Sequence, residues 1–335
     1  MIQRGLLPIA WLYGAVAAGR NLAFDWGLLR RYRSTLPVVS IGNAVLGGTG
    51  KTPAVIQICR LLVAEGAQPV VLTRGYGGRT PTPHLVSDGD SAEAVGDEAL
   101  MMQQLHGLKV VVSPQRVQGA KYIESQKLGT VIVLDDGLQH RWLDRNLDLM
   151  CIDLSSPKAA DQFREGACLP AGRFREPKRG ALRRVHGVVF SARSQQPVHF
   201  EGLDLPPRLE RFTSLVEVEK IANAHGAELP TGAVVTALSA IAGPGGFHST
   251  LQLLGFRVGE RLVYPDHHRY TEADIKRIRQ RAQGTPIVIT EKDAVKVAGL
   301  LPEAYICRIR AKIEPEMRLR QLFREKGILQ NSGNT

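Results

Sequence analysis

The chain has 335 residues, of which 44% are hydrophobic and 22% are charged, so it holds enough apolar side chain for two ordinary domains. This composition excludes a disordered, collagenous or polytopic membrane protein. A formal charge of +11 predicts a polyanionic partner, and four cysteines without a CxxC pair favour reduced thiols over disulfides or structural zinc.

The first segment, residues 1–35, is expected to associate with a membrane surface. Its apolar run, residues 6–18, is shorter than the roughly 18–20 residues that cross a bilayer. The run imitates a signal peptide, but a nucleotide-binding loop follows it and argues against export. Trp11, Trp26 and several arginines suit a helix lying in an anionic interface. The alternative is a first helix that packs on the core.

Residues 36–205 alternate between short apolar runs and helical stretches, which predicts a doubly wound α/β domain. The expected strands are Val38–Ile41, Val70–Thr73, Val110–Ser113, Val131–Asp135, Leu149–Asp153 and Val188–Ser191, and the clearest helices are Pro53–Glu65 and Gly96–Leu105. Ligands of such a domain bind at the carboxyl ends of its strands.

The rest of the chain is expected to form an extended linker or hairpin over 206–232 and a smaller α/β domain over 233–335. Strands are expected at 234–238, 256–258 and 286–290, helices near 247–254 and over 272–282, and a frayed tail at 330–335.

A glycine-rich loop from Gly42 to Thr52 follows the first strand, and Pro53 opens a helix directly after it. Consecutive glycines let backbone N–H groups surround phosphates, and we expect Lys51 to reach the β- and γ-phosphates and the Thr52 hydroxyl to bind Mg²⁺. The pattern G-x-x-x-x-G-K-[ST] is met except for its first glycine, which is Val45. The expected nucleotide-binding residues are Gly47, Gly48, Thr49, Gly50, Lys51 and Thr52.

Three other patterns carry polar chemistry. Asp135 and Asp136 end an apolar strand, where a second Mg²⁺ contact is expected; a solvated turn is the alternative. Asp97 opens a helix and is either a proton acceptor or an N-cap. His267, next to Asp266, is either part of a proton-accepting pair or a surface histidine. A basic stretch over 173–184 suits a second phosphate or lipid headgroups, or is a solvated helix face.

Together these motifs resemble the tetraacyldisaccharide 4′-kinase (lipid A 4′-kinase) family, in order and over nearly the whole chain. The residues that carry the resemblance are Gly42–Pro53, Arg74–Tyr76, Gly96–Glu98, Asp135–His140, Leu169–Gly172, Arg175–Pro177, Asp266–His268 and Thr290–Asp293.

The resemblance implies a P-loop NTPase-like core with a mostly parallel sheet, a smaller second α/β domain and an N-terminal membrane-associating helix. It implies transfer of the γ-phosphoryl of ATP to the 4′-hydroxyl of tetraacyldisaccharide 1-phosphate, giving lipid IVA, at the cytosolic face of the bacterial inner membrane. No nucleic-acid partner is expected, and the protein is expected to be a monomer.

The resemblance also assigns roles to residues. Asp97 is the base, assisted by His267, and Lys51 is catalytic. The residues that serve ATP–Mg²⁺ are Lys51, Thr52, Asp135, Asp136 and His140, with Thr52, Asp135 and Asp136 as metal ligands, and the substrate residues are Tyr76, Arg175 and Glu176. For residues 290–293 it gives no role.

Two rival functions explain less of the sequence. A deviant-loop partitioning or metal-insertion ATPase shares the loop but carries an early lysine where this chain has Leu46. A nucleic-acid-binding protein explains the charge but leaves the loop and the aspartate pair without a role, and strongly salt-dependent DNA binding is its signature.

Overall fold

The computed structural model describes residues 3–47, 50–154, 157–193, 202–297 and 299–329. Gly48, Thr49 and the expected frayed tail 330–335 lie outside these ranges. The strands are β1 Val38–Gly42, β2 Pro69–Thr73, β3 His84–Leu85, β4 Lys109–Val112, β5 Val131–Asp135, β6 Leu147–Asp153, β7 Gly187–Arg193, β8 Glu210–Ala222, β9 Val234–Ser239, β10 Arg257–Val263, β11 Ile287–Thr290 and β12 Tyr305–Glu314. The helices are η1 Arg4–Leu6, α1 Leu7–Asp25, α2 Lys51–Ala64, α3 Ala92–Val95, α4 Asp97–Gln104, α5 Arg116–Ser125, α6 Pro157–Glu165, α7 Lys178–Arg184, α8 Pro244–Leu253, α9 Glu272–Ala282, α10 Glu291–Val297 and α11 Glu316–Glu325.

Within the described residues, twelve strands form one sheet in the order β10-β9-β11-β12-β8-β7-β6-β1-β5-β2-β4-β3. Neighbouring strands are parallel except where β12 pairs with β8 and where β3 pairs with β4. The central strands are buried along their whole length, because helices cover both faces of the sheet. The predicted α/β class with a P-loop NTPase-like core is confirmed.

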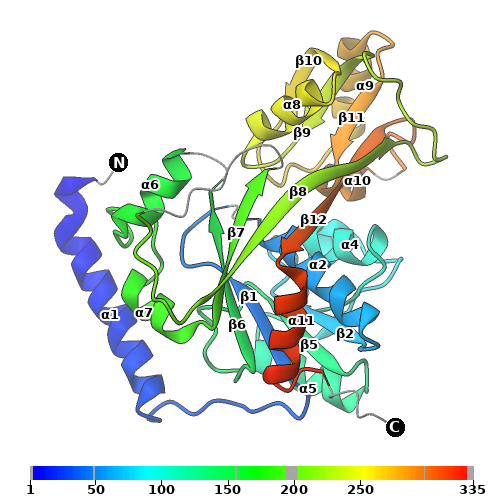
Figure 1. Cartoon of the computed structure of the whole chain (residues 1–335). Coiled ribbons are helices and arrows are strands. Elements are labelled where there is room, and N and C mark those ends of the chain that lie inside the picture. Colours follow the sequence, from blue (N-terminus) through cyan, green and yellow to red (C-terminus); the bar gives the residue numbers. More distant parts are fainter. Residues whose placement is uncertain (1–2, 48–49, 155–156, 194–201, 298, 330–335) are drawn as a thin grey trace.

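Residues 206–232 differ from the expected linker. The segment is extended, but β8 occupies about half of it and pairs with β7 along one edge and with β12 along the other. Figure 1 shows β8 and β12 running from the core into the C-terminal unit, so core and C-terminal unit share a continuous sheet. The division of the chain into two domains stays a prediction.

Helix α1 packs on the core through one face and leaves apolar side chains on the other. Its buried residues are Ala10, Gly14, Asn21 and Phe24, and Figure 1 shows α1 beside α6 and α7. On the outer face Trp11 is 71% exposed. No helix in the described part of the chain is both long and apolar enough to span a membrane.

Candidate active site

The glycine-rich loop joins β1 to α2 in a conformation that requires glycine at its end. Gly50 has a φ of +70°, and a Cβ on it would lie 2.0 Å from Ser191 Oγ. Lys51 and Thr52 therefore begin α2 at the carboxyl edge of the sheet, where the amino end of a helix favours phosphate.

The loop and the Asp135–Asp136 segment are held together by charge. Lys51 Nζ lies 3.5 Å from Asp136 Oδ1, and Arg175 Nη1 donates to Asp136 Oδ2 at 3.0 Å. Desolvation opposes ionisation of Asp136, but Lys51 and Arg175 outweigh it and hold the pKa of Asp136 below its usual value. Arg175 Nη2 also donates to Asn43 Oδ1 at 2.8 Å. Arg175 thus connects the two loops and is only partly exposed.

Asp135 has the properties of a cation ligand. It is buried, its Oδ2 accepts from Thr73 Oγ1 at 3.2 Å, and its Oδ1 has no hydrogen-bond partner among the described residues. Burial and the nearby charges of Glu98 and Asp136 raise the pKa of Asp135 to about 6, against the effect of Lys51. This excess of negative charge fits a bound cation.

The acidic and hydroxyl side chains here fit Mg²⁺ that arrives with nucleotide phosphates. Such a magnesium needs one or two carboxylates, with phosphates and water completing the octahedron. No group of three or more His, Cys, Asp or Glu side chains that could hold a metal occurs in the described ranges.

Glu98 joins this cluster, although no role was predicted for it. Thr52 Oγ1 donates to Glu98 Oε2 at 3.1 Å, and Lys292 of α10 forms an ion pair with the same carboxylate. Its place beside Asp97 in the Gly96–Glu98 motif was the available signal.

Asp97 and His267 come together although 170 residues separate them. His267 Nδ1 and Asp97 Oδ2 lie 2.9 Å apart. Gly96, with a φ of +92°, lets the chain turn into α4, because a Cβ there would lie 2.6 Å from Tyr76 O. His267 itself has a φ of 61°, a left-handed conformation that is uncommon for a non-glycine residue.

Three further residues were predicted for the site, and each has different surroundings. Tyr76 is 74% exposed, with its ring centroid 5.4 Å from that of His267, so it lies beside the Asp97–His267 pair. Burial and four arginines lower the pKa of His140 to about 4, and its Nε2 has no partner among the described residues. Glu176 differs from expectation: it is 0% exposed and accepts from Asn21, Gln139 and Arg184. With no surface for substrate, it stabilises the contact with α1.

The 290–293 motif has a structural place at the junction of core and C-terminal unit. Asp293 is fully buried and accepts from Ala240 N at 3.1 Å and from Tyr270 Oη at 3.1 Å. Lys296 Nζ lies 2.9 Å from Asp293 Oδ1 and 3.8 Å from Asp97 Oδ2. Helix α10 therefore supports the Asp97–His267 pair.

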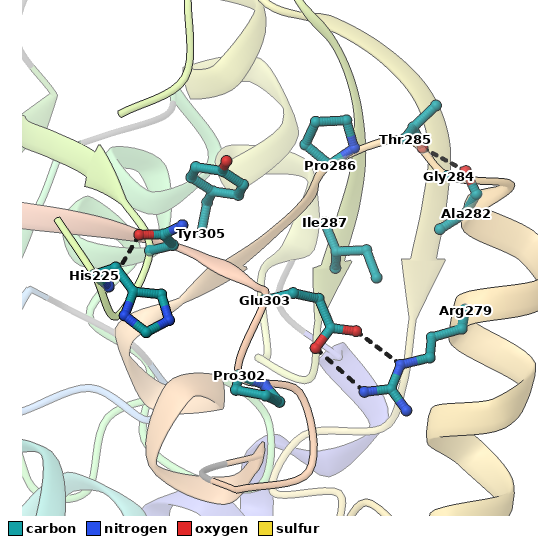
Figure 2. A pocket seen from close by; sticks show the side chains of 11 residues that line it. His225, Arg279, Ala282, Gly284, Thr285, Pro286, Ile287, Pro302, Glu303 and Tyr305 are labelled. Atoms are coloured by element: carbon teal, nitrogen blue, oxygen red, sulfur yellow. Dashed lines mark hydrogen bonds and ion pairs between the residues drawn. The ribbon is translucent and has the colours of Figure 1, made fainter. Parts of the chain in front are cut away.

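Two cavities lie away from these residues. One, of about 610 Å³, lies at the amino ends of β11 and β12, at the other end of β11 from Thr290; Figure 2 shows the Arg279–Glu303 ion pair on its wall. The other, of about 930 Å³, lies along α1. Its walls combine apolar residues of α1 with basic side chains, namely Leu7, Ala10, Trp11, Gly14, Ala15, Ala18, Arg164, Lys178, Arg179 and Arg183.

A family model described as tetraacyldisaccharide-1-P 4′-kinase matches residues 2–326. The chain belongs to this family. A tetraacyldisaccharide 4′-kinase of an Anaeromyxobacter species is 37% identical over 328 residues, covering 92% of this chain and 86% of that protein. Another, from Alkalilimnicola ehrlichii, is 38% identical over 320 residues, covering 94% and 90%.

A solved structure of the family, LpxK from Aquifex aeolicus in complex with ATP, has a TM-score of 0.78 and 27% identity, covering 97% of this chain and 99% of that one. The family prediction made from the motifs is confirmed, and with it the activity of a tetraacyldisaccharide 4′-kinase.

Proposed function

We propose that this tetraacyldisaccharide 4′-kinase holds ATP–Mg²⁺ between the loop 42–52 and the Asp135–Asp136 segment, and that Asp97 with His267 accepts the proton of the acceptor 4′-hydroxyl. The 4′-oxygen attacks the γ-phosphorus, the bond from that phosphorus to the β–γ bridging oxygen breaks, and lipid IVA and ADP result. Mg²⁺ neutralises charge on the phosphates when bound, and Thr52, Asp135 and Asp136 would hold it.

The observation that carries the proposal is that two adjacent carboxylates at the start of α4 contact different parts of the site. Asp97 faces His267, while Glu98 faces Thr52 of the phosphate loop. One turn of α4 therefore brings a proton acceptor, Asp97, close to the phosphate-binding loop that Glu98 contacts. This arrangement suits phosphoryl transfer, which depends mainly on positioning and charge neutralisation.

The test is transfer of labelled γ-phosphate from ATP to tetraacyldisaccharide 1-phosphate in detergent micelles. We expect product from the wild type and a loss of about three orders of magnitude in Lys51→Ala, because Lys51 neutralises charge that develops on the phosphates. ATP hydrolysis that responds to another partner, without lipid product, would contradict the proposal and favour a partitioning ATPase.

The acylated acceptor and an anionic membrane surface are the proposed partners, with the chain acting as a monomer at the cytosolic membrane face. The cavity along α1, apolar on one wall and basic on the other, suits an acylated phosphate. Trp11, Leu12, Val16 and Trp26 are strongly exposed, near the exposed Arg20 and Arg30. Aromatic and basic side chains together favour an anionic interface.

Membrane attachment is tested with vesicles that contain anionic lipid. Replacing Trp11 and Trp26 by alanine should weaken binding at least about tenfold, because each indole buries apolar area in the interface. Leu253→Ala, at a comparably exposed position on α8, serves as control and should leave binding unchanged. Equal binding of the double variant and the wild type in a sedimentation assay would exclude α1 as the attachment surface.

A further inference from the structure

His106 and Glu291 form a buried contact that the proposed proton transfer does not use. Their side chains are 3% and 5% exposed, and His106 Nε2 lies 3.3 Å from Glu291 Oε1. Neither atom has another hydrogen-bond partner among the described residues. No lysine or arginine in the described ranges forms an ion pair with Glu291, although burying an unpaired charge is costly. The two side chains therefore depend on each other.

Arg60 of α2 decides which nitrogen of His106 carries the proton. Arg60 Nη2 lies 3.3 Å from His106 Nδ1. A guanidinium group can only donate hydrogen bonds, so Nδ1 accepts, and the proton of the neutral imidazole is on Nε2, facing Glu291. The position between Arg60 and Glu291 thus requires an acceptor atom on one side and a donor on the other.

This contact joins the same three helices that meet at the active site. Near the phosphate loop, Thr52 of α2 and Lys292 of α10 both contact Glu98 in the first turn of α4. Just after the other end of α4, His106 contacts α2 and α10 again. Figure 1 shows these helices beside one another, and one apolar cluster contains buried residues of all three. Residues 291 and 292 of α10 therefore reach opposite ends of α4, and together they fix its direction.

We propose that His106 and Glu291 are positioning residues for phosphoryl transfer. Their contact, with Arg60 behind it, fixes the direction of α4, whose first turn carries Asp97. A helix that is held at one end only can pivot about that end, and a shift of about 1 Å at a reacting group costs up to about a hundredfold in rate. The proposal rests on the proposed role of Asp97 for its effect on the rate, not for the contact itself.

Kinetics of two variants at one position test the proposal. His106→Leu neither accepts from Arg60 nor donates to Glu291. We expect its kcat with tetraacyldisaccharide 1-phosphate to fall at least about tenfold, and its KM for ATP to stay within about twofold, because the loop 42–52 belongs to neither α4 nor α10. His106→Gln presents an acceptor and a donor on one amide, and should keep kcat within about threefold of the wild type. A kcat of His106→Leu within about twofold of the wild type, or no recovery in His106→Gln, would overturn the proposal.

His186→Leu is the matched control. His186 Nδ1 accepts from Asp148 N at 3.1 Å, just before β7 and away from α4 and α10. The control loses a comparable hydrogen bond, and its kcat should stay within about twofold of the wild type. A loss as large as that of His106→Leu would overturn the assignment. If His106→Leu does not fold, Arg60→Met, at a partly exposed position, takes its place and should lower kcat at least about threefold; an unchanged kcat would overturn the proposal.

Amide hydrogen exchange separates the contact from the role of Asp97. In His106→Leu the amides of α4 and α10 should exchange at least about tenfold faster than in the wild type, and those of α5 at the wild-type rate, because only α4 and α10 lose the contact. This result supports the contact even if Asp97→Asn keeps full kcat, in which case the proposed proton acceptor fails. Unchanged exchange in α4 and α10 would overturn the positioning role.

Discussion

Replacing Asp97 by asparagine should lower kcat by about two to four orders of magnitude and leave ATP–Mg²⁺ affinity unchanged. Asparagine keeps the shape of the side chain and an oxygen for His267 Nδ1, but it loses the charge that supports proton transfer. The ATP–Mg²⁺ affinity is unaffected because Asp97 contacts His267 and Lys296, not Lys51 or Thr52. Single-turnover transfer and equilibrium nucleotide binding measure the two effects separately.

The partner residue provides the second half of this test. His267→Ala should lose a similar amount, and the double variant should lose little more than either single variant, because the two side chains act as a unit. His268 is a matched control on the same turn: it pairs with Asp274 at 3.2 Å and packs against Tyr264, away from Asp97. We expect His268→Ala to stay within a few-fold of the wild type. Full kcat in His267→Ala would exclude the pair.

The core strands were predictable from the sequence because each is buried on both faces and reads as a continuous apolar run. The strand Val131–Asp135 was predicted with its exact bounds, and β1 and β2 with an error of one residue at one end. The loop 42–52 was equally clear, because phosphate binding at the start of a helix requires glycines followed by Lys51 and Thr52.

Strands β8 and β12 were not predictable in the same way. In β12, apolar and charged residues alternate from Cys307 to Glu314, which is typical of a strand with one buried face, although this segment was not predicted as a strand. What fixes both strands is their pairing with each other, with Cys307 opposite Ile221. Alternation indicates an extended segment, but it does not show which distant segment that strand will pair with.

The candidate site, like the fold, was predictable from the sequence only in part. Asp97 and His267 were found as separate candidates, and the distance of 2.9 Å between them required the fold. Glu98 and Lys292 meet across 194 residues, and neither had been given a role. For Glu176, a motif that resembled substrate-binding residues instead marks a buried contact with α1. A motif identifies residues that matter to a family, but burial decides whether they can touch a ligand.

Replacing Asp293 by alanine should lower the free energy of unfolding by about 3–5 kcal/mol, because the buried Lys296 then has no carboxylate at the position of Asp293. Thr290 Oγ1, Tyr270 Oη and Ala240 N lose their acceptor in the same step. The loss is measured by denaturant unfolding. Glu303→Ala is the control: Glu303 pairs with Arg279 at the surface, about half exposed, and its removal should cost less than about 1 kcal/mol.

The variant Asp293→Ala should also lose transfer activity before it unfolds, because Lys296 lies 3.8 Å from Asp97 Oδ2 and is then free to form a closer ion pair with it. Removing both charges, in Asp293→Asn with Lys296→Met, should recover part of the stability, since no buried charge remains unpaired. This double variant should not recover kcat fully, because the positive charge of Lys296 near Asp97 is then missing. A stability loss below about 1 kcal/mol in Asp293→Ala would show that the buried network is not what holds α10 against the core.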